Sequence, residues 1–339
     1  GLTRVGRRPR QMLISDRSIV FGLILSCLPV VASAEQLVLG IIGDSKRIAY
    51  LNETLLQPFT ELTGISIKIS SISEHDGADE ENLLQQAIRE KWDFLTLNEA
   101  QAMRLCGAGD LSPTGTMRQR QNSLLPEVSK AVTCHSFNEP RTETMVYNLN
   151  AYQRDIPDHI SAFFDLERFP GKRAVAVEAP GLLEMALMAQ GVPASQVYHL
   201  LSTTRGVELA IGVFAKAKPQ IIWTKDHGET ESLLADGSAT MGLIEMGARA
   251  DNDANAASGS AQPLNRLGTT SSIAHNTSWL PTAAGEGSVT ALGQFVDYAK
   301  QVEIFNVTLG AGIQRDARWF ATVSPDLKTR LDSWRAALQ

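Results

Sequence analysis

Polar and charged side chains follow several apolar runs of the chain, at points where a buried strand would end. The residues with this placement are Asp44, Ser45, Asn98, Glu178, Trp223, Asp226 and Glu245. Carboxylates, hydroxyls, amides and an indole ring bind polar solutes through hydrogen bonds, ion pairs and cation–π contacts. We therefore predict these residues as ligand-binding positions.

Four of these positions also have a structural explanation as helix starts. Asp44 and Ser45 precede a predicted helix, and Asn98 and Asp226 stand in the same relation to later ones. Such residues cap a helix, and acids there favour its dipole, without any ligand. The sequence leaves both explanations open.

The other three positions have structural alternatives of their own. Glu178 could be a solvated acid in the turn before Pro180, and Trp223 could be part of a hydrophobic core. Glu245 ends an apolar strand, where an unpaired carboxylate is costly to bury. Arg249, four residues further on, could neutralise it.

Motifs for catalysis and for metal binding are missing. The chain has no Gly-x-Ser-x-Gly elbow, no His-Glu-x-x-His pair and no phosphate-binding loop. Its six histidines lack metal-ligand spacing, and the acidic stretch 251–255 lacks the glycine and glutamate of a calcium loop. We predict that the protein is not an enzyme and that it uses no metal and no cofactor.

Composition excludes several other classes of function. The 339 residues are 43% hydrophobic, 20% charged and 6% aromatic, with a net charge of −6. These values are typical of a globular chain, and the length favours two domains. Because an acidic protein has no general attraction to a phosphate backbone, we expect no nucleic-acid partner.

Residues 1–34 have the pattern of a signal peptide. Arginines come first, an apolar run follows from Ile19 to Ala32, and Ala32-Ser33-Ala34 fits a signal peptidase. The apolar run is shorter than the about 20 residues that a membrane-spanning helix needs. We predict cleavage after Ala34 and a soluble, periplasmic mature protein.

Alternatives for this segment stay open. It could be an uncleaved anchor, Arg7-Arg8 could begin a twin-arginine signal, and Cys27 could carry a lipid. Translation could also start at Met12.

The remaining two cysteines are Cys106 and Cys134. A lone pair of cysteines in an exported protein favours a disulfide, which we predict here. The alternative is two separate buried thiols.

Short apolar strands alternate with amphipathic helices along the mature chain. The predicted strands are 36–42, 65–69, 94–97, 144–147, 173–177, 220–223 and 239–244. The predicted helices are 48–59, 80–91, 182–189, 195–201, 207–216, 229–235, 289–302 and 324–338, with a loop at 251–262. This order indicates two successive α/β units with mainly parallel sheets. Ligands bind at the carboxyl ends of such strands and between two lobes.

Several motifs in the second unit carry a resemblance to a known family. FFD at 163–165 is followed by FPGKR at 169–173, and KPQ at 218–220 precedes a strand that ends at Trp223. LLADG at 233–237, WD at 92–93 and both Cys106 and Cys134 occur in the same order. Over roughly residues 36–335 the chain resembles periplasmic solute-binding proteins of the spermidine/putrescine type, which serve ABC importers.

The resemblance implies a two-lobed periplasmic binding protein fold of type II, each lobe a mainly parallel α/β sheet flanked by helices. It places lobe 1 at 35–144 plus 275–305, and lobe 2 at 145–274 plus 306–339. It also implies a small-molecule solute and an ABC permease in the inner membrane as partners. We expect a monomer.

The pocket departs from the family pattern. Where relatives commonly carry Trp, Asn and Asp, this chain has Glu245, Met246 and Asn276, and Thr224 follows Trp223. Asn276 thereby joins the predicted ligand-binding residues. The aromatic box for ammonium groups is largely lost. The ligand would be a polyamine or related small cation held by carboxylates such as Glu178, Asp226 and Glu245, or a different polar solute.

The sequence thus predicts a binding protein that delivers a small polar solute to an ABC importer by cleft closure. One alternative is a two-lobed partner of a sensor receptor, and another is an exported enzyme on the same scaffold.

Overall fold

The computed structural model describes residues 35–77, 79–108, 137–152, 154–247, 264–266, 271–282, 284–305 and 312–338. They belong to one unit, Ala34–Gln339. The predicted signal segment 1–34, Cys134, Arg249 and the predicted loop 251–262 lie outside the described residues. Signal cleavage and the disulfide therefore stay predictions.

Three parallel strands form the sheet of the first half. They are β1 (Gln36–Ile42), β2 (Ser66–Ile72) and β3 (Phe94–Asn98), in the order β2-β1-β3. Alternate β1 side chains Leu37, Leu39 and Ile41 are fully buried. Helices cover both faces of such a sheet, which explains why this run is almost continuously apolar. The predicted parallel arrangement is confirmed.

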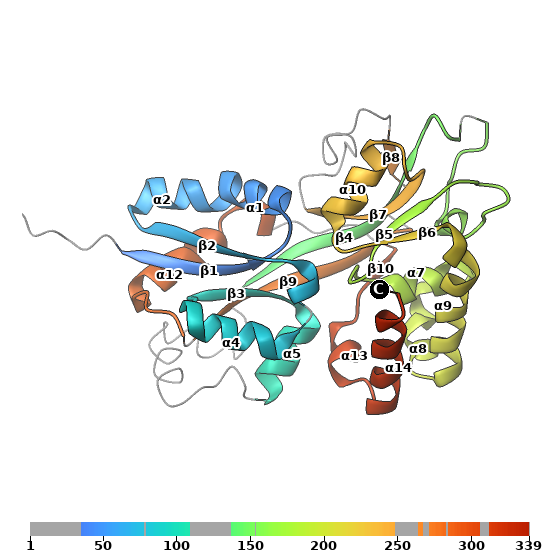
Figure 1. The fold of residues 1–339 in the computed structure, drawn as a ribbon. Coiled ribbons are helices and arrows are strands. Elements are labelled where there is room, and N and C mark those ends of the chain that lie inside the picture. Colours follow the sequence, from blue (N-terminus) through green and yellow to red (C-terminus); the bar gives the residue numbers. More distant parts are fainter. Residues whose placement is uncertain are drawn as a thin grey trace, which may run out of the picture. The chain divides into compact units, whose positions relative to one another are not determined.

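Helices pack against this sheet (Figure 1). Their buried side chains form two hydrophobic clusters with it. One cluster takes side chains from a continuous helical segment of α1 (Ser45–Leu51), a π-helical turn (Asn52–Leu56) and α2 (Gln57–Thr63), and from α12 (Val289–Ala299). The other takes them from α4 (Glu80–Glu90) and α5 (Glu99–Ala108). The short helix α3 (Glu74–Gly77) follows β2. The predicted stop at Gly64 is confirmed, because its φ of 74° is a left-handed value that glycine adopts at low cost.

The second half repeats the arrangement with three more parallel strands. Strand β5 (Arg173–Ala176) lies between β6 (Ile221–Thr224) and β7 (Met241–Gly247). Its helices are α7 (Leu182–Ala189), α8 (Val197–Leu201), α9 (Thr204–Ala217), α10 (His227–Ala235), α13 (Ala317–Thr322) and α14 (Pro325–Ala336). Short 3₁₀ turns lie at Ile160–Phe163, Ala194–Gln196, Lys218–Gln220 and Glu303–Phe305. The helix predicted at 182–189 has the same bounds as α7. Ser324 caps α14 as predicted.

Two long strands join the halves. Strand β9 (Ile273–Pro281) is antiparallel to β3 and to β4 (Phe137–Asn148), and β4 is antiparallel to β7. The short strands β8 (Leu264–Arg266) and β10 (Ile313–Gln314) pair with β4 and β9. The strand predicted at 144–147 was too short, because its first part carries alternating charges and not an apolar run. The predicted lobe boundaries at 145 and 275 fall in these two strands and stay a prediction.

In the described part of the chain, no helix has the length and apolar character that a membrane crossing requires.

Candidate functional site

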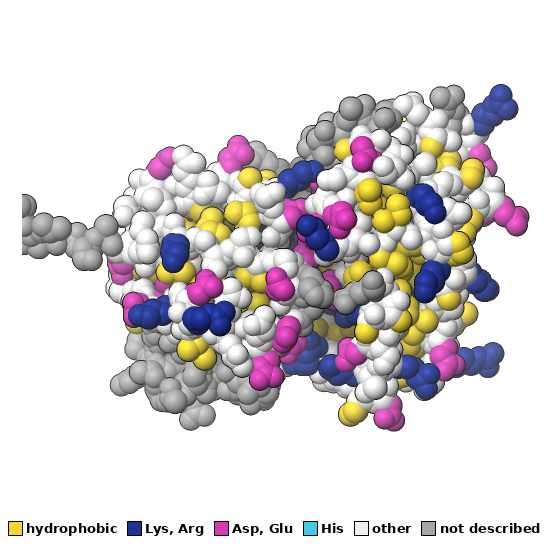
Figure 2. Space-filling model, viewed as in Figure 1, with side chains coloured by type: hydrophobic (Ala, Val, Ile, Leu, Met, Phe, Trp, Pro, Cys, Tyr) yellow, Lys and Arg dark blue, Asp and Glu magenta, His cyan; other side chains and the backbone are white. Residues whose placement is uncertain are grey.

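A cavity of about 170 Å³, the central cavity, is lined by both halves of the sheet. The first half contributes the ends of β1 and β3 and the start of α5, including Asn98 and Arg104. The second half contributes Glu178 after β5, His227 at the start of α10 and Glu245 of β7. Figure 2 shows Lys, Arg, Asp and Glu side chains gathered where these two groups of elements meet. The carboxyl ends of parallel strands thus surround this cavity, as ligand sites of α/β folds do.

The structure divides the predicted site residues between two hollows. Asn98, Glu178 and Glu245 line the central cavity. Asp44, Ser45 and Asp226 line a neighbouring, more open hollow of about 530 Å³, the side hollow. Glu74 of α3 lines both of them.

Three predicted site residues act as helix caps. Asp44 accepts a hydrogen bond from the Arg47 N–H at 2.8 Å, and Asp226 accepts one from the Glu229 N–H at 2.8 Å. Asn98 caps α5 by accepting from the Gln101 N–H at 2.9 Å. A capping role does not prevent ligand contact, because Asn98 still lines the central cavity.

The remaining two predicted residues are not among those that line the central cavity. Trp223 is half-buried and packs its ring against Phe214 and Trp334, with centroid distances of 5.6 and 6.5 Å. Asn276 donates a hydrogen bond to Glu99 at 3.1 Å. The core-packing alternative therefore describes the surroundings of Trp223.

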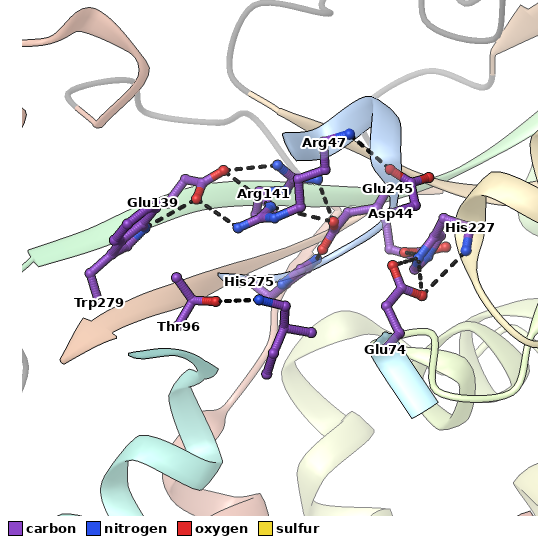
Figure 3. A network of polar contacts seen from close by, with 12 residues as sticks. Asp44, Arg47, Glu74, Thr96, Glu139, Arg141, His227, Glu245, His275 and Trp279 are labelled. Atoms are coloured by element: carbon purple, nitrogen blue, oxygen red, sulfur yellow. Dashed lines mark hydrogen bonds and ion pairs between the residues drawn. The ribbon is translucent and has the colours of Figure 1, made fainter. Parts of the chain in front are cut away.

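An ionic network, the Arg–Glu network, joins Arg47, Glu139, Arg141 and Glu245 (Figure 3). Arg47 and Arg141 each donate to Glu139 at 2.8 Å, and Arg141 also pairs with Glu245. All four side chains are at most 13% exposed. Arg141 of β4 is a partner of Glu245, and the suggested pairing with Arg249 is not tested, because Arg249 lies outside the described residues.

The two arginines set the ionisation of this network. Burial alone would raise the pKa of Glu139 and of Glu245, because it removes water from the charged form. The nearby guanidinium groups outweigh burial and hold the pKa of both carboxyls below the usual range. Both stay ionised, and neither is a free counter-charge for a ligand ammonium group.

A second group, the histidine cluster, consists of Glu74, Glu143 and His227. The His227 ring lies between the two carboxylates. Its Nε2 is 3.0 Å from Glu143, and its Nδ1 is 2.9 Å from Glu74 (Figure 3). Burial opposes the charged imidazole, but the two carboxylates raise the pKa of His227 well above its usual value. Burial raises the pKa of Glu143 to about 7. Glu74 comes from the first half and His227 from the second, so this cluster links them.

Three further arginines line the central cavity. Arg104 pairs with Glu80 and donates to the Phe320 carbonyl at 3.1 Å, whereas Arg335 lies 3.7 Å from Glu178. The Arg315 guanidinium stacks on the Phe320 ring, 3.7 Å from its centroid. His275, which also lines the cavity, is kept neutral, because burial lowers its pKa to about 3.

The sequence prediction missed most of these charged residues. Arg47, Glu74, Arg104 and Arg315 stand in segments where nothing in the local pattern distinguishes them from surface charges. A signal for the β4 residues was present, since Glu139, Arg141 and Glu143 alternate at the spacing of one strand face. Among the described residues, no group of acidic, histidine or cysteine side chains is arranged to hold a metal ion.

Comparison with known proteins decides the family. Residues 54–269, more than half of the chain, match the family described as bacterial extracellular solute-binding protein. The chain belongs to this family. In the gamma-aminobutyric acid-binding protein of Pseudomonas aeruginosa, 161 residues align at 28% identity, covering 46% of this chain and 44% of that protein. The chain therefore matches less than half the length of this curated relative.

Solved structures of solute-binding proteins share the fold. The PBP MotA of A. tumefaciens B6, crystallised with glucopine, superposes with a TM-score of 0.66 at 17% identity, over 88% of this chain and 99% of that one. The spermidine/putrescine ABC transporter substrate-binding protein PotD of Streptococcus pneumoniae gives 0.54 at 15% identity, over 89% and 99%. The predicted two-lobed fold and the predicted kinship with such binding proteins are confirmed.

Proposed function

We propose that this member of the solute-binding family captures a small polar solute in the central cavity and delivers it to an ABC permease of the inner membrane. The observation that carries the proposal is the position of that cavity. It lies at the carboxyl ends of the strands, between side chains of both halves. A periplasmic location and work as a monomer are part of the proposal.

Cleft closure follows from the same arrangement. If β4 and β9 flex, the two halves separate and the central cavity opens to solvent, as in hinge-bending receptors. A solute that contacts both halves stabilises the closed form, because it binds that form more tightly. Asn98 and Glu178 are the proposed contacts of this kind, one from each half.

The other predictions about function have less support from the geometry. Asp44, Ser45 and Asp226 line the side hollow and would contact the solute only if it extends there. A polyamine needs free carboxylates, but Glu178 and Glu245 each face an arginine. Delivery to a sensor receptor would use the same cavity, and an exported enzyme would need an acid–base pair that the family does not imply.

The test combines a solute panel with a variant that fills the central cavity. We expect one class of solute to raise the melting temperature, since a ligand at 100 times its Kd stabilises the folded protein by about 2.7 kcal/mol. Thr277→Trp places an indole in the cavity and should abolish this shift. Thr329→Trp, on the exposed face of α14, is the matched control and should keep it.

Two results would contradict the proposal. One is a panel of amino acids, polyamines, sugars and organic acids in which no compound shifts the wild-type protein. The other is an undiminished shift in a folded Thr277→Trp variant.

A further inference from the structure

The central cavity offers hydrogen-bond donors without acceptors. Within the described part of the chain, the Nε–H groups of Arg47 and Arg315 are buried and have no hydrogen-bond partner. Both residues line the cavity. A buried donor that lacks an acceptor costs roughly 1–3 kcal/mol, so an acceptor supplied by a ligand is favoured.

The carboxylates of the cavity lining, in contrast, already have cationic partners. Glu74 accepts from His227, and Glu245 accepts from Arg141. Glu178 lies 3.7 Å from Arg335. A ligand ammonium group would have to compete with these cations for each carboxylate.

Arg315 has an ion-pair partner, but its Nε–H donates no hydrogen bond to any described residue. Its Nε lies 3.8 Å from Glu184 Oε1, which is beyond hydrogen-bond distance, and that oxygen already accepts the Tyr198 hydroxyl at 2.7 Å. Burial lowers the pKa of Arg315 and outweighs the opposing effect of Glu184, and the nearby charges of Arg335 and Arg104 act in the same direction as burial. The side chain stays charged, since arginine does not lose its proton in proteins. The buried Nε–H of Arg315 therefore has a counter-charge but no hydrogen-bond acceptor among the described residues, and an oxygen of an anionic ligand would supply that acceptor.

The aromatic ring in the cavity lining is already in contact with a cation of the protein. Phe320 is the one Phe, Tyr or Trp side chain that the described residues place on the lining of the central cavity, and the Arg315 guanidinium stacks on its ring at 3.7 Å. A cationic ligand would need that ring face for itself. Stacking also holds the planar guanidinium in a fixed orientation, which favours two parallel hydrogen bonds to an oxyanion.

We propose that the solute carries a carboxylate group and that this group binds Arg315. The proposal rests on the proposed function and names the chemical class of the solute. Free carboxylic acids and amino acids share this chemistry, and the experiment separates them.

The experiment uses three probes with the same four-carbon chain and different end groups. They are 4-aminobutanoate, butanoate and 1,4-diaminobutane, each titrated into the mature protein by calorimetry. We expect 4-aminobutanoate to bind and 1,4-diaminobutane to bind at least about tenfold more weakly. Binding of butanoate as well would identify the carboxylate as sufficient, whereas its failure would add an amine contact to the carboxylate contact.

Arg315→Gln removes the proposed anchor. A carboxylate held by charge-assisted hydrogen bonds should lose roughly 100-fold in affinity, because each such bond contributes about 1.5–3 kcal/mol. Arg315→Lys keeps the charge but lacks the planar guanidinium group, so its affinity for the carboxylate should lie between those of the wild type and Arg315→Gln. Arg330→Gln is the matched control, because Arg330 is exposed on α14 and pairs there with Glu208.

The outcomes distinguish the two proposals. Preference for 1,4-diaminobutane, or equal affinity of wild type and a folded Arg315→Gln variant for a carboxylate probe, would overturn the carboxylate proposal and leave solute binding intact. Should no carboxylate bind while another class from the solute panel does, the carboxylate proposal also fails. If no class of solute in the panel binds, the proposed function itself is contradicted. The thermal transition of solute-free Arg315→Gln is recorded first to show that the variant is folded, because the substitution leaves the buried Glu184 carboxylate without its ion-pair partner.

Discussion

The Arg–Glu network and the histidine cluster both extend from strand β4, but they differ in their balance of charge. The network sets two guanidinium groups against Glu139 and Glu245. The histidine cluster sets one imidazole against Glu74 and Glu143. The balanced group holds its carboxyl pKa values below the usual range, whereas Glu143 of the unbalanced group has a raised pKa.

This difference gives the two clusters opposite dependence on pH. A carboxyl with a lowered pKa stabilises the fold above its ordinary pKa of 4.5, and that contribution is lost as the pH falls. A group with a raised pKa stabilises the fold at low pH, and that contribution is lost as the pH rises. The network therefore serves as a fixed part of the fold, and the histidine cluster responds to protons.

Removal of one charge from the network should have the largest effect. Glu139→Gln leaves Arg47 and Arg141 without the carboxylate that both of them contact. Breaking a buried ionic group in this way costs roughly 3–5 kcal/mol of unfolding free energy. Urea denaturation of the wild type and the variant at pH 7 measures this loss of unfolding free energy. Glu286→Gln, which breaks the exposed pair with Lys91, is the control and should change stability by less than about 1 kcal/mol. Equal effects of the two variants would show that the network does not stabilise the fold.

The second effect is a fall in stability as the pH rises. His227 and Glu143 both have raised pKa values, so the folded protein binds protons more tightly than the unfolded chain does. The contribution of Glu143 is complete below pH 4.5 and is lost as the pH passes about 7. That of His227 is complete below 6.5 and is lost as the pH rises through its own raised pKa.

Denaturation between pH 5 and pH 8 measures this effect. We expect the wild-type protein to lose on the order of 2–3 kcal/mol of unfolding free energy over this range from Glu143 alone, because its pKa rises from 4.5 to about 7 and each pKa unit corresponds to about 1.4 kcal/mol. Glu143→Gln cannot titrate at this position and should flatten the curve. A wild-type curve that rises with pH would contradict the assignment.

Sequence patterns predicted the scaffold of these clusters better than the clusters themselves. Strands such as β1 and helices such as α7 are specified by local apolar periodicity, and both were predicted at their observed bounds. Strand β9 was missed, because Ile273–Pro281 mixes His, Asn, Thr and Ser with its apolar residues. Its identity as a strand depends on pairing with β3 and β4, which are distant in sequence.

The candidate site was predictable only in part, for the same physical reason. Glu178 and Asn98 were predicted because residues at strand ends face the cavity of a parallel sheet, and both line the central cavity. Arg315 was not found, because its position follows from the pairing of the two-residue strand β10 with β9. Glu245 was found, but its partner Arg141 comes from a neighbouring strand more than one hundred positions away in the sequence. The local sequence pattern indicates which side chains are buried, but it does not indicate which of them contact one another in the fold.

A third prediction concerns the link between the halves. Glu74 contacts both the ring and the backbone N–H of His227, so it joins α3 to α10 across the central cavity. Glu74→Gln should weaken this link by about 1 kcal/mol and favour separation of the halves, and solute affinity should fall about fivefold. Small-angle scattering of the solute-free protein would show a larger radius of gyration than for wild type. Glu81→Gln, an exposed change on α4, is the control. An unchanged radius would mean that the histidine cluster does not hold the halves together.

The smallest effect is expected at the neighbouring contact between the same halves. Lys46 of α1 pairs with Glu231 of α10 at 2.5 Å, but the Lys46 side chain is 48% exposed. Water and salt screen such a pair, and ordering the long lysine side chain costs entropy, so Lys46→Gln should change stability by less than about 1 kcal/mol. The change should shrink further in 0.5 M NaCl, while that of Glu139→Gln should persist, because the network is screened less. Denaturation of both variants at low and high salt tests the contrast. If high salt reduced the stability changes of both variants by the same fraction, burial would not explain why these charged contacts differ in strength.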